Sequence, residues 1–253
     1  NWIPAARLVR SFLGVTLVSA LALLASPMHA LAQVEQSNAG LEAFGRRLQS
    51  VLNAADPSSL DAVVSAELQP ALNQRYQRFR QDFPGVTWRL EPAAPLADGR
   101  ETLLVRVRGE AESEGLRYRL EAIERIAIRL DDGRMVDQEL VAHESLLRSG
   151  ERPLAVTLAI PDAVLTGSRY DVDLIVEEPL DQALVAAGLI DLTEQQVVDQ
   201  LRPNLSLEPM GGGGLFKSVQ APQAPGSQTW ALMLVHPDGV VTATKRVRVV
   251  SSL

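Results

Sequence analysis

Two stretches near the start of the chain place apolar residues at helical spacing, so each stretch has one apolar face. The first set is Leu41, Phe44, Leu48, Val51 and Leu52, and the second is Leu72, Tyr76, Phe79 and Phe83. Asp56 followed by Pro57 is a typical helix start, and Pro84 followed by Gly85 is a typical stop. The pattern predicts two or three amphipathic helices.

From residue 103 onward the apolar period shortens to two, which indicates β-strands. Strands are predicted at 103–107, 116–130 and 135–147, and the odd positions of the longest one carry mostly Arg and Glu. One face of this sheet is therefore apolar and the other charged, and we expect the helices to cover the apolar face. We predict an α+β domain over residues 33–150, with helices packed on one face of a bent antiparallel sheet.

The register of the two longest strands is predicted from their apolar positions. A three-residue loop at 131–133 pairs Ile128 with Val136 and Glu124 with Leu140. This loop length keeps both apolar sets on one face, whereas a two-residue loop would separate them.

Short alternating segments separated by turn signals fill the second half of the chain, residues 151–253. The Asp238-Gly239 pair is a strong signal for a two-residue hairpin loop, which would pair Leu234 with Ala243. We predict an all-β immunoglobulin-like sandwich for this half. The polar residues around position 151 fit a boundary between the two domains.

The element order of residues 35–148, with the long strand Leu116 to Leu130, resembles the nuclear-transport-factor-like family. That resemblance implies leading helices in the concave side of a bent sheet, often around a pocket. The segment PLAVTLAIPDAVLTGSRYDVDLIVEEP resembles the opening strands of immunoglobulin-like domains of bacterial exported proteins. The whole chain resembles uncharacterised exported proteins of photosynthetic bacteria, and none of these resemblances selects a function.

The N-terminal segment has the features of a secretory signal. Two arginines precede an apolar run from Phe12 to Ala25, and Ala30 and Ala32 provide the small residues that a signal peptidase reads. The run is shorter than the ~20 residues that a spanning helix requires. We interpret residues 1–32 as a cleaved signal peptide, with an uncleaved anchor as the alternative. The protein is then exported to the periplasm or another extracytoplasmic compartment.

Composition narrows the chemistry. The chain has 31 acidic and 24 Lys or Arg side chains, and this acidic balance disfavours nucleic acid as a partner. It has no cysteine, which excludes thiolate nucleophiles and thiolate-bound zinc or iron–sulfur sites. We expect no cofactor and no metal site.

Glu124 is the main candidate for binding, because it falls on the apolar parity of its strand. A desolvated carboxyl group there can act as a general base or accept hydrogen bonds from a ligand. Gln138 and Glu144 are predicted on the matching face of the next strand, so we predict a ligand-binding set of Glu124, Gln138 and Glu144 without an assigned catalytic residue. The alternative is a bend or bulge that turns Glu124 to solvent.

Other polar signals are weaker. His143 falls on the polar parity of its strand and His236 adjoins a turn, so both are expected at the surface. The segment GGGGLFKS has part of the spacing of a phosphate-binding loop. However, Phe216 stands where glycine is required, and prolines follow where a helix should begin. We expect a glycine turn that leads into an edge strand.

Two classes of function remain. We favour an exported, non-enzymatic binding or scaffold protein of the cell envelope, whose partner is another envelope protein. Formation of a homo-oligomer fits the same class, and we expect no nucleic acid partner and no membrane span in the mature chain. The alternative is a small-molecule-binding or catalytic pocket in the first domain that uses Glu124.

Export predicts a shortened mature chain. Because cleavage after Ala32 leaves Gln33 at the N-terminus, mass analysis of the protein from its native cells should give a chain that begins at Gln33. Recovery of the uncleaved chain from the cytoplasm would contradict the signal-peptide interpretation.

Overall fold

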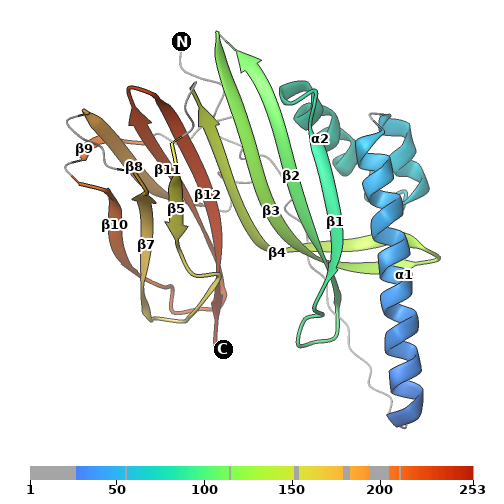
Figure 1. The fold of residues 1–253 in the computed structure, drawn as a ribbon. Coiled ribbons are helices and arrows are strands. Elements are labelled where there is room, and N and C mark those ends of the chain that lie inside the picture. Colours follow the sequence, from blue (N-terminus) through green and yellow to red (C-terminus); the bar gives the residue numbers. More distant parts are fainter. Residues whose placement is uncertain are drawn as a thin grey trace.

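The computed structural model describes residues 27–54, 56–113, 115–150, 154–178, 183–193, 196, 205–210 and 212–252. These residues form mostly β-strands (Figure 1). The elements are α1 (Pro27–Asn53), a 3-10 helix (Pro57–Ala62), α2 (Gln69–Asp82), β1 (Thr87–Ala93), β2 (Glu101–Ser113), β3 (Leu116–Asp131), β4 (Arg134–Ser149), β5 (Val156–Ala159), β6 (Ala163–Leu165), β7 (Arg169–Val176), β8 (Val185–Leu192), β9 (Glu208–Met210), β10 (Gly214–Gln220), β11 (Gly226–His236) and β12 (Gly239–Val250). The predicted apolar run at 12–25 lies outside the described residues, and the predicted cleavage point lies within α1.

One nine-stranded sheet contains strands from both halves of the chain (Figure 1). Its order is β1-β2-β3-β4-β12-β11-β8-β9, and β6 pairs with the end of β12. Neighbours along this order are antiparallel. Strands β10, β7 and β5 form a second, three-stranded sheet.

The predicted fold class is wrong. An α+β domain followed by a separate immunoglobulin-like sandwich requires the sheet to end near residue 150. Instead, β4 pairs with β12, for example Ser145 with Thr244, and a single large antiparallel sheet continues through the described part of both halves. Local periodicity predicts strands but not their distant partners, so this pairing left no signal in either half. The division into residues 33–150 and 151–253 stays a prediction.

Two hydrophobic cores lie on opposite faces of the shared sheet. Leu120 pairs with Leu147, and Leu147 pairs with Thr242, so these side chains share one face. The next pair, Leu146 with Ala243, points to the opposite face because side chains alternate along a strand. The first core contains Leu120 and Leu147, and the second contains Ala243 with Leu146 packed against it.

Each core has its own cover. The two helices contribute their apolar faces to the first core, as their spacing predicts, through Leu41, Phe44, Leu48, Leu52, Leu72 and Tyr76. The small sheet contributes to the second core through Val156, Tyr170, Val172, Leu174 and Val176. The helices therefore cover one face of β1–β4, while the small sheet covers the opposite face of β8, β11 and β12.

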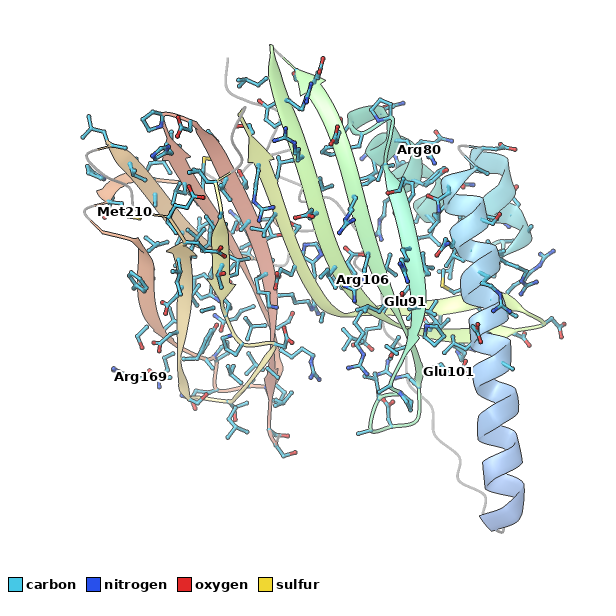
Figure 2. The ribbon with its side chains drawn as sticks, viewed as in Figure 1. Arg80, Glu91, Glu101, Arg106, Arg169 and Met210 are labelled. Atoms are coloured by element: carbon cyan, nitrogen blue, oxygen red, sulfur yellow. The ribbon has the colours of Figure 1, made fainter. Side chains whose placement is uncertain are left out.

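Helix α1 also protects the free edge of β1. The Asn53 side-chain amide donates to the carbonyl oxygen of Trp88 at 2.8 Å and accepts from its N–H at 3.0 Å. The Gln49 side chain accepts from the N–H of Leu90 at 2.8 Å. Arg80, labelled in Figure 2, places its guanidinium 5.2 Å from the Trp88 ring centroid. The hydrogen bonds from Asn53 and Gln49 satisfy backbone groups that an open edge would offer to another strand.

The β3–β4 hairpin departs from the predicted register. Its loop is Asp132-Gly133 alone, with φ of 47° and 71°, as the tight hairpin turn with two left-handed residues requires. Two register shifts then follow, which leave Val136 and Val141 as extra residues in β4. Since the second shift reverses the faces of β4 from that point onward, Glu124 pairs with His143 and not with Leu140.

The second predicted hairpin is nearly correct. Leu234 pairs with Val241 and not with the predicted Ala243. This shift of two residues keeps every side chain on its predicted face. The glycine-rich segment leads into β10, an edge strand of the small sheet, as predicted. Phe216 in this strand is 63% exposed.

Two glycines allow the end of β4 to approach the turn before β12. A Cβ atom on Gly150 would lie 2.0 Å from the carbonyl oxygen of Asp238, and one on Gly239 would lie 2.0 Å from that of Ser149. No side chain fits at these distances, so the junction between the halves requires glycine at both positions.

Candidate functional site

Glu124 is buried in the middle of β3, on the face that carries the first core. The residue is 1% exposed, so the alternative in which a bulge turns it to solvent is wrong. The bulge lies in the neighbouring strand β4 instead. A charged group in this place requires partners that replace water.

A chain of hydrogen bonds runs from Glu124 across three strands. The Glu124 Oε1 atom lies 2.9 Å from Nδ1 of His143. The His143 Nε2 atom lies 2.8 Å from Oγ1 of Thr244 on β12, and this oxygen lies 2.6 Å from Oγ of Ser145. With a carboxylate at Glu124, Nδ1–H donates to it, Nε2 accepts from the Thr244 hydroxyl, and Thr244 accepts from Ser145. The chain therefore connects the first half to the second.

Arg75 on α2 adds a positive charge near this chain. Burial lowers the pKa of Arg75, and the charge of Glu124 acts in the opposite direction. The electrostatic interaction places Glu124 between a helix of the first core and His143. Arg75 thus compensates the charge of Glu124 from the helix side, while His143 donates a hydrogen bond to the same carboxylate.

The order of carboxylate, imidazole and hydroxyl is also the order that activates a nucleophile. However, Thr244 is 1% exposed and His143 is 8% exposed, so a substrate has no direct route to the hydroxyl. The cavity beside Glu124 measures about 40 Å³. Ligand pockets typically measure about 300–1,000 Å³, and this space fits only a few waters. The geometry favours a structural role for the chain of hydrogen bonds.

The structure brings together two of the three predicted ligand-binding residues. Glu124 and Gln138 line the same small cavity. Glu144 lies on the opposite face of the sheet, because the register shift at Val141 reverses the faces of β4. Their predicted role in ligand binding stays a prediction.

Glu144 belongs to a separate ionic group. Nζ of Lys245 lies 2.8 Å from Glu144 and 2.6 Å from Asp162. Burial lowers the pKa of Lys245, but its hydrogen bonds to Asp162 and Glu144 outweigh that effect, so the pKa is raised. This group holds the loop before β6 against β12.

The prediction that His143 lies at the surface is wrong, and Thr244 was not predicted at all. Both errors follow from the register of β4. The sequence contains one signal, since Leu140 and Val141 are adjacent apolar residues that interrupt the period of two. For Thr244 no local signal exists, because its partner His143 is 101 residues away.

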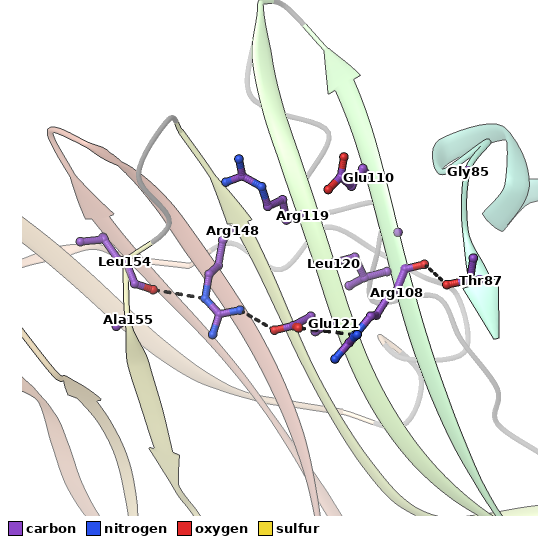
Figure 3. Close-up of a pocket in the computed structure, with 11 residues that line it drawn as sticks. Gly85, Thr87, Arg108, Glu110, Arg119, Leu120, Glu121, Arg148, Leu154 and Ala155 are labelled. Atoms are coloured by element: carbon purple, nitrogen blue, oxygen red, sulfur yellow. Dashed lines mark hydrogen bonds and ion pairs between the residues drawn. The ribbon is translucent and has the colours of Figure 1, made fainter. Parts of the chain in front are cut away.

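A larger hollow lies on the outer face of β1–β4, which is the face that the helices do not cover (Figure 3). It measures about 570 Å³, and Leu154 and Ala155 border it beside β4. Arg148 donates to the carbonyl oxygen of Leu154 at 3.2 Å and forms an ion pair with Glu121 at 3.0 Å. Arg108 lies 3.8 Å from the same carboxylate.

Arg119 differs from the other arginines of this hollow. Its Nη1 atom is buried and has no hydrogen-bond partner among the described residues. Figure 3 shows its guanidinium directed away from Glu110, which stands opposite on β2. We call Arg108, Arg119, Arg148 and Glu121 the arginine pocket. It is the hollow in the described structure that combines ligand-sized volume with an unsatisfied charged donor.

The described residues contain no group of three or more His, Asp or Glu side chains placed to hold a metal ion. Neither α-helix in the described part of the chain has both the length and the apolar character to cross a membrane. Residues 151–250 match the model of a family described as a domain of unknown function (DUF8623). No curated protein matches the chain.

The hydrogen-bonded chain predicts energetic coupling between the two halves. Glu124→Leu and Thr244→Val should each reduce the free energy of unfolding by about 1–3 kcal/mol, because each leaves a buried polar atom of His143 without its partner. Since both act on His143, their effects in a double-mutant cycle should differ from the sum by at least about 0.5 kcal/mol. Urea denaturation gives the free energy of unfolding of the wild type, the two single variants and the double variant.

Thr157→Val provides the matched control, because the Thr157 hydroxyl donates to Glu177 in the small sheet and has no link to Glu124. Its effect should add to that of Glu124→Leu within about 0.5 kcal/mol. Additive behaviour of Thr244→Val as well would show that the chain does not couple the halves.

Proposed function

We propose that the chain is an exported, non-enzymatic binding or scaffold protein of the cell envelope that holds another envelope protein on the outer face of β1–β4. The observation that carries the proposal is the arginine pocket, a hollow of about 570 Å³ in which the buried Nη1 atom of Arg119 has no partner among the described residues. Export rests on the charged start, the apolar run and the small residues of the segment 1–32.

The outer face has the mixed character of a protein-binding surface. A second hollow of about 210 Å³ adjoins the arginine pocket and shares Arg108 and Glu121 with it. Ile123 borders this second hollow and is 42% exposed between charged neighbours. Arginines around exposed apolar side chains are typical of surfaces that contact another protein.

The surface also rests on a packed core. The first core packs against the other face of β1–β4. Hydrogen bonds to β12 hold the edge of β4 that β3 does not cover. A preorganised surface loses less conformational entropy when a partner binds. This favours a holding or scaffolding role for the outer face.

The alternative, a small-molecule or catalytic pocket that uses Glu124, has less support from the geometry. Its cavity measures about 40 Å³, and the Oε1 atom of Glu124 is already hydrogen-bonded to His143. We therefore base the proposal on the outer face and not on the interior.

The proposal predicts crosslinking that depends on position. A photo-crosslinking amino acid in place of Ile123 should join the chain to a different protein in its native envelope, because Ile123 is exposed within the outer face. The same amino acid in place of Leu165, which is exposed to a similar degree on β6, is the control. Mass spectrometry of the crosslinked products identifies the partner.

Equal products from both positions, or products of position 123 that contain only a second copy of this chain, would contradict the proposal. The first result would mean random encounter. The second would mean that the outer face serves self-association.

A further inference from the structure

Three arginines reach the arginine pocket from three neighbouring strands. Arg108 extends from β2, Arg119 from β3 and Arg148 from β4, and Arg119 stands directly opposite Arg148 in the register. Like charges directly opposite each other destabilise a sheet unless an anion compensates them. Figure 3 shows that the compensating carboxylate, Glu121, lies between Arg148 and Arg108.

Arg119 does not share this compensation. No ion pair joins it to another described side chain, and its Nη1 atom is buried without a hydrogen-bond partner among the described residues. A buried donor of a charged group is costly to leave unsatisfied, more so than a neutral one. Within the described part of the pocket, the guanidinium of Arg119 therefore lacks an acceptor.

The charges of the pocket indicate which acceptor fits. Among the described residues, its lining has three arginines and two glutamates, Glu110 and Glu121, so one positive charge is in excess there. A single carboxylate matches this excess, whereas a phosphate carries about −1.5 to −2 at neutral pH. Glu121 shows that a carboxylate can bridge two of these guanidinium groups in the same hollow.

We propose that Arg119 binds a carboxylate side chain from an acidic segment of the protein that the outer face holds. This inference rests on the proposed function and identifies the chemistry of the partner. The volume of about 570 Å³ admits a side chain with its flanking backbone, since it lies in the range of ligand sites. The planar guanidinium donates two parallel hydrogen bonds to a carboxylate, which orients the partner on the sheet.

Fluorescence anisotropy with the full mature chain tests the inference. The probe is a labelled hexapeptide with two acidic side chains, compared with the same peptide in which both are amides, at low ionic strength. The acidic peptide should bind at least tenfold more tightly than the amide peptide. Arg119→Gln should weaken its binding about tenfold, because the unsatisfied guanidinium is lost.

Two further variants separate a binding site from a general charge effect and from a loss of stability. Arg129→Gln removes the same charge from an exposed position ten residues farther along the same strand, and it should leave binding unchanged. Glu121→Gln removes the carboxylate that occupies Arg108 and Arg148, so it should tighten binding of the acidic peptide several-fold. A loss of stability alone cannot produce tighter binding.

Three results would overturn the inference: equal binding of the two peptides, equal effects of Arg119→Gln and Arg129→Gln, or weaker binding after Glu121→Gln. Binding of inorganic phosphate without binding of the acidic peptide would also overturn it, in favour of a small anion. If position 123 still crosslinks to a different protein in any of these cases, the proposed function stands and only the carboxylate assignment fails.

Discussion

The pairing of β4 with β12 is the contact on which the rest of this architecture depends. It joins residues about 100 positions apart, from Glu144 with Lys245 to Arg148 with Val241, and makes one sheet from strands of both halves. Gly150 and Gly239 permit the close approach at its end. Because side chains alternate along these strands, the same two strands supply the first core on one face and the second core on the other.

The helices and the small sheet pack on different strands of the large sheet, and this arrangement also creates the outer face. The helices cover one face of β1–β4 and the small sheet covers the opposite face of the neighbouring strands, so the outer face of β1–β4 stays exposed beside Leu154. The arginine pocket lies where the outer face meets Leu154. The buried chain from Glu124 to Thr244 lies on the other face of the same strands, where it holds the two halves in register. The face that the helices cover thus carries the buried hydrogen bonds, and the outer face carries the candidate binding site.

Much of the local structure follows from the sequence. The apolar faces of the helices, the long strand β3 and the edge strand after the glycine run were all predictable from spacing, while the burial of Glu124 was one of two alternatives. The spacing of apolar residues does not predict which distant strands pair or in which register. Pairing of β4 with β12 has no local signal, and one extra residue at Val141 moves His143 inward and Glu144 outward. The charged face of these strands is predictable from their period, but which arginines meet in the arginine pocket depends on the register of three strands.

Native-state hydrogen exchange of the full chain tests the central claim most directly. If the β4–β12 pairing holds the chain together, the hydrogen-bonded amides between residues 241–245 and 144–148 should exchange only through global unfolding. Their free energies of exchange should then equal those of amides in the centre of β3 and in β11. Exchange of the β4–β12 amides through a lower-energy opening, while both cores remain protected, would contradict the account and show two independent units that only touch.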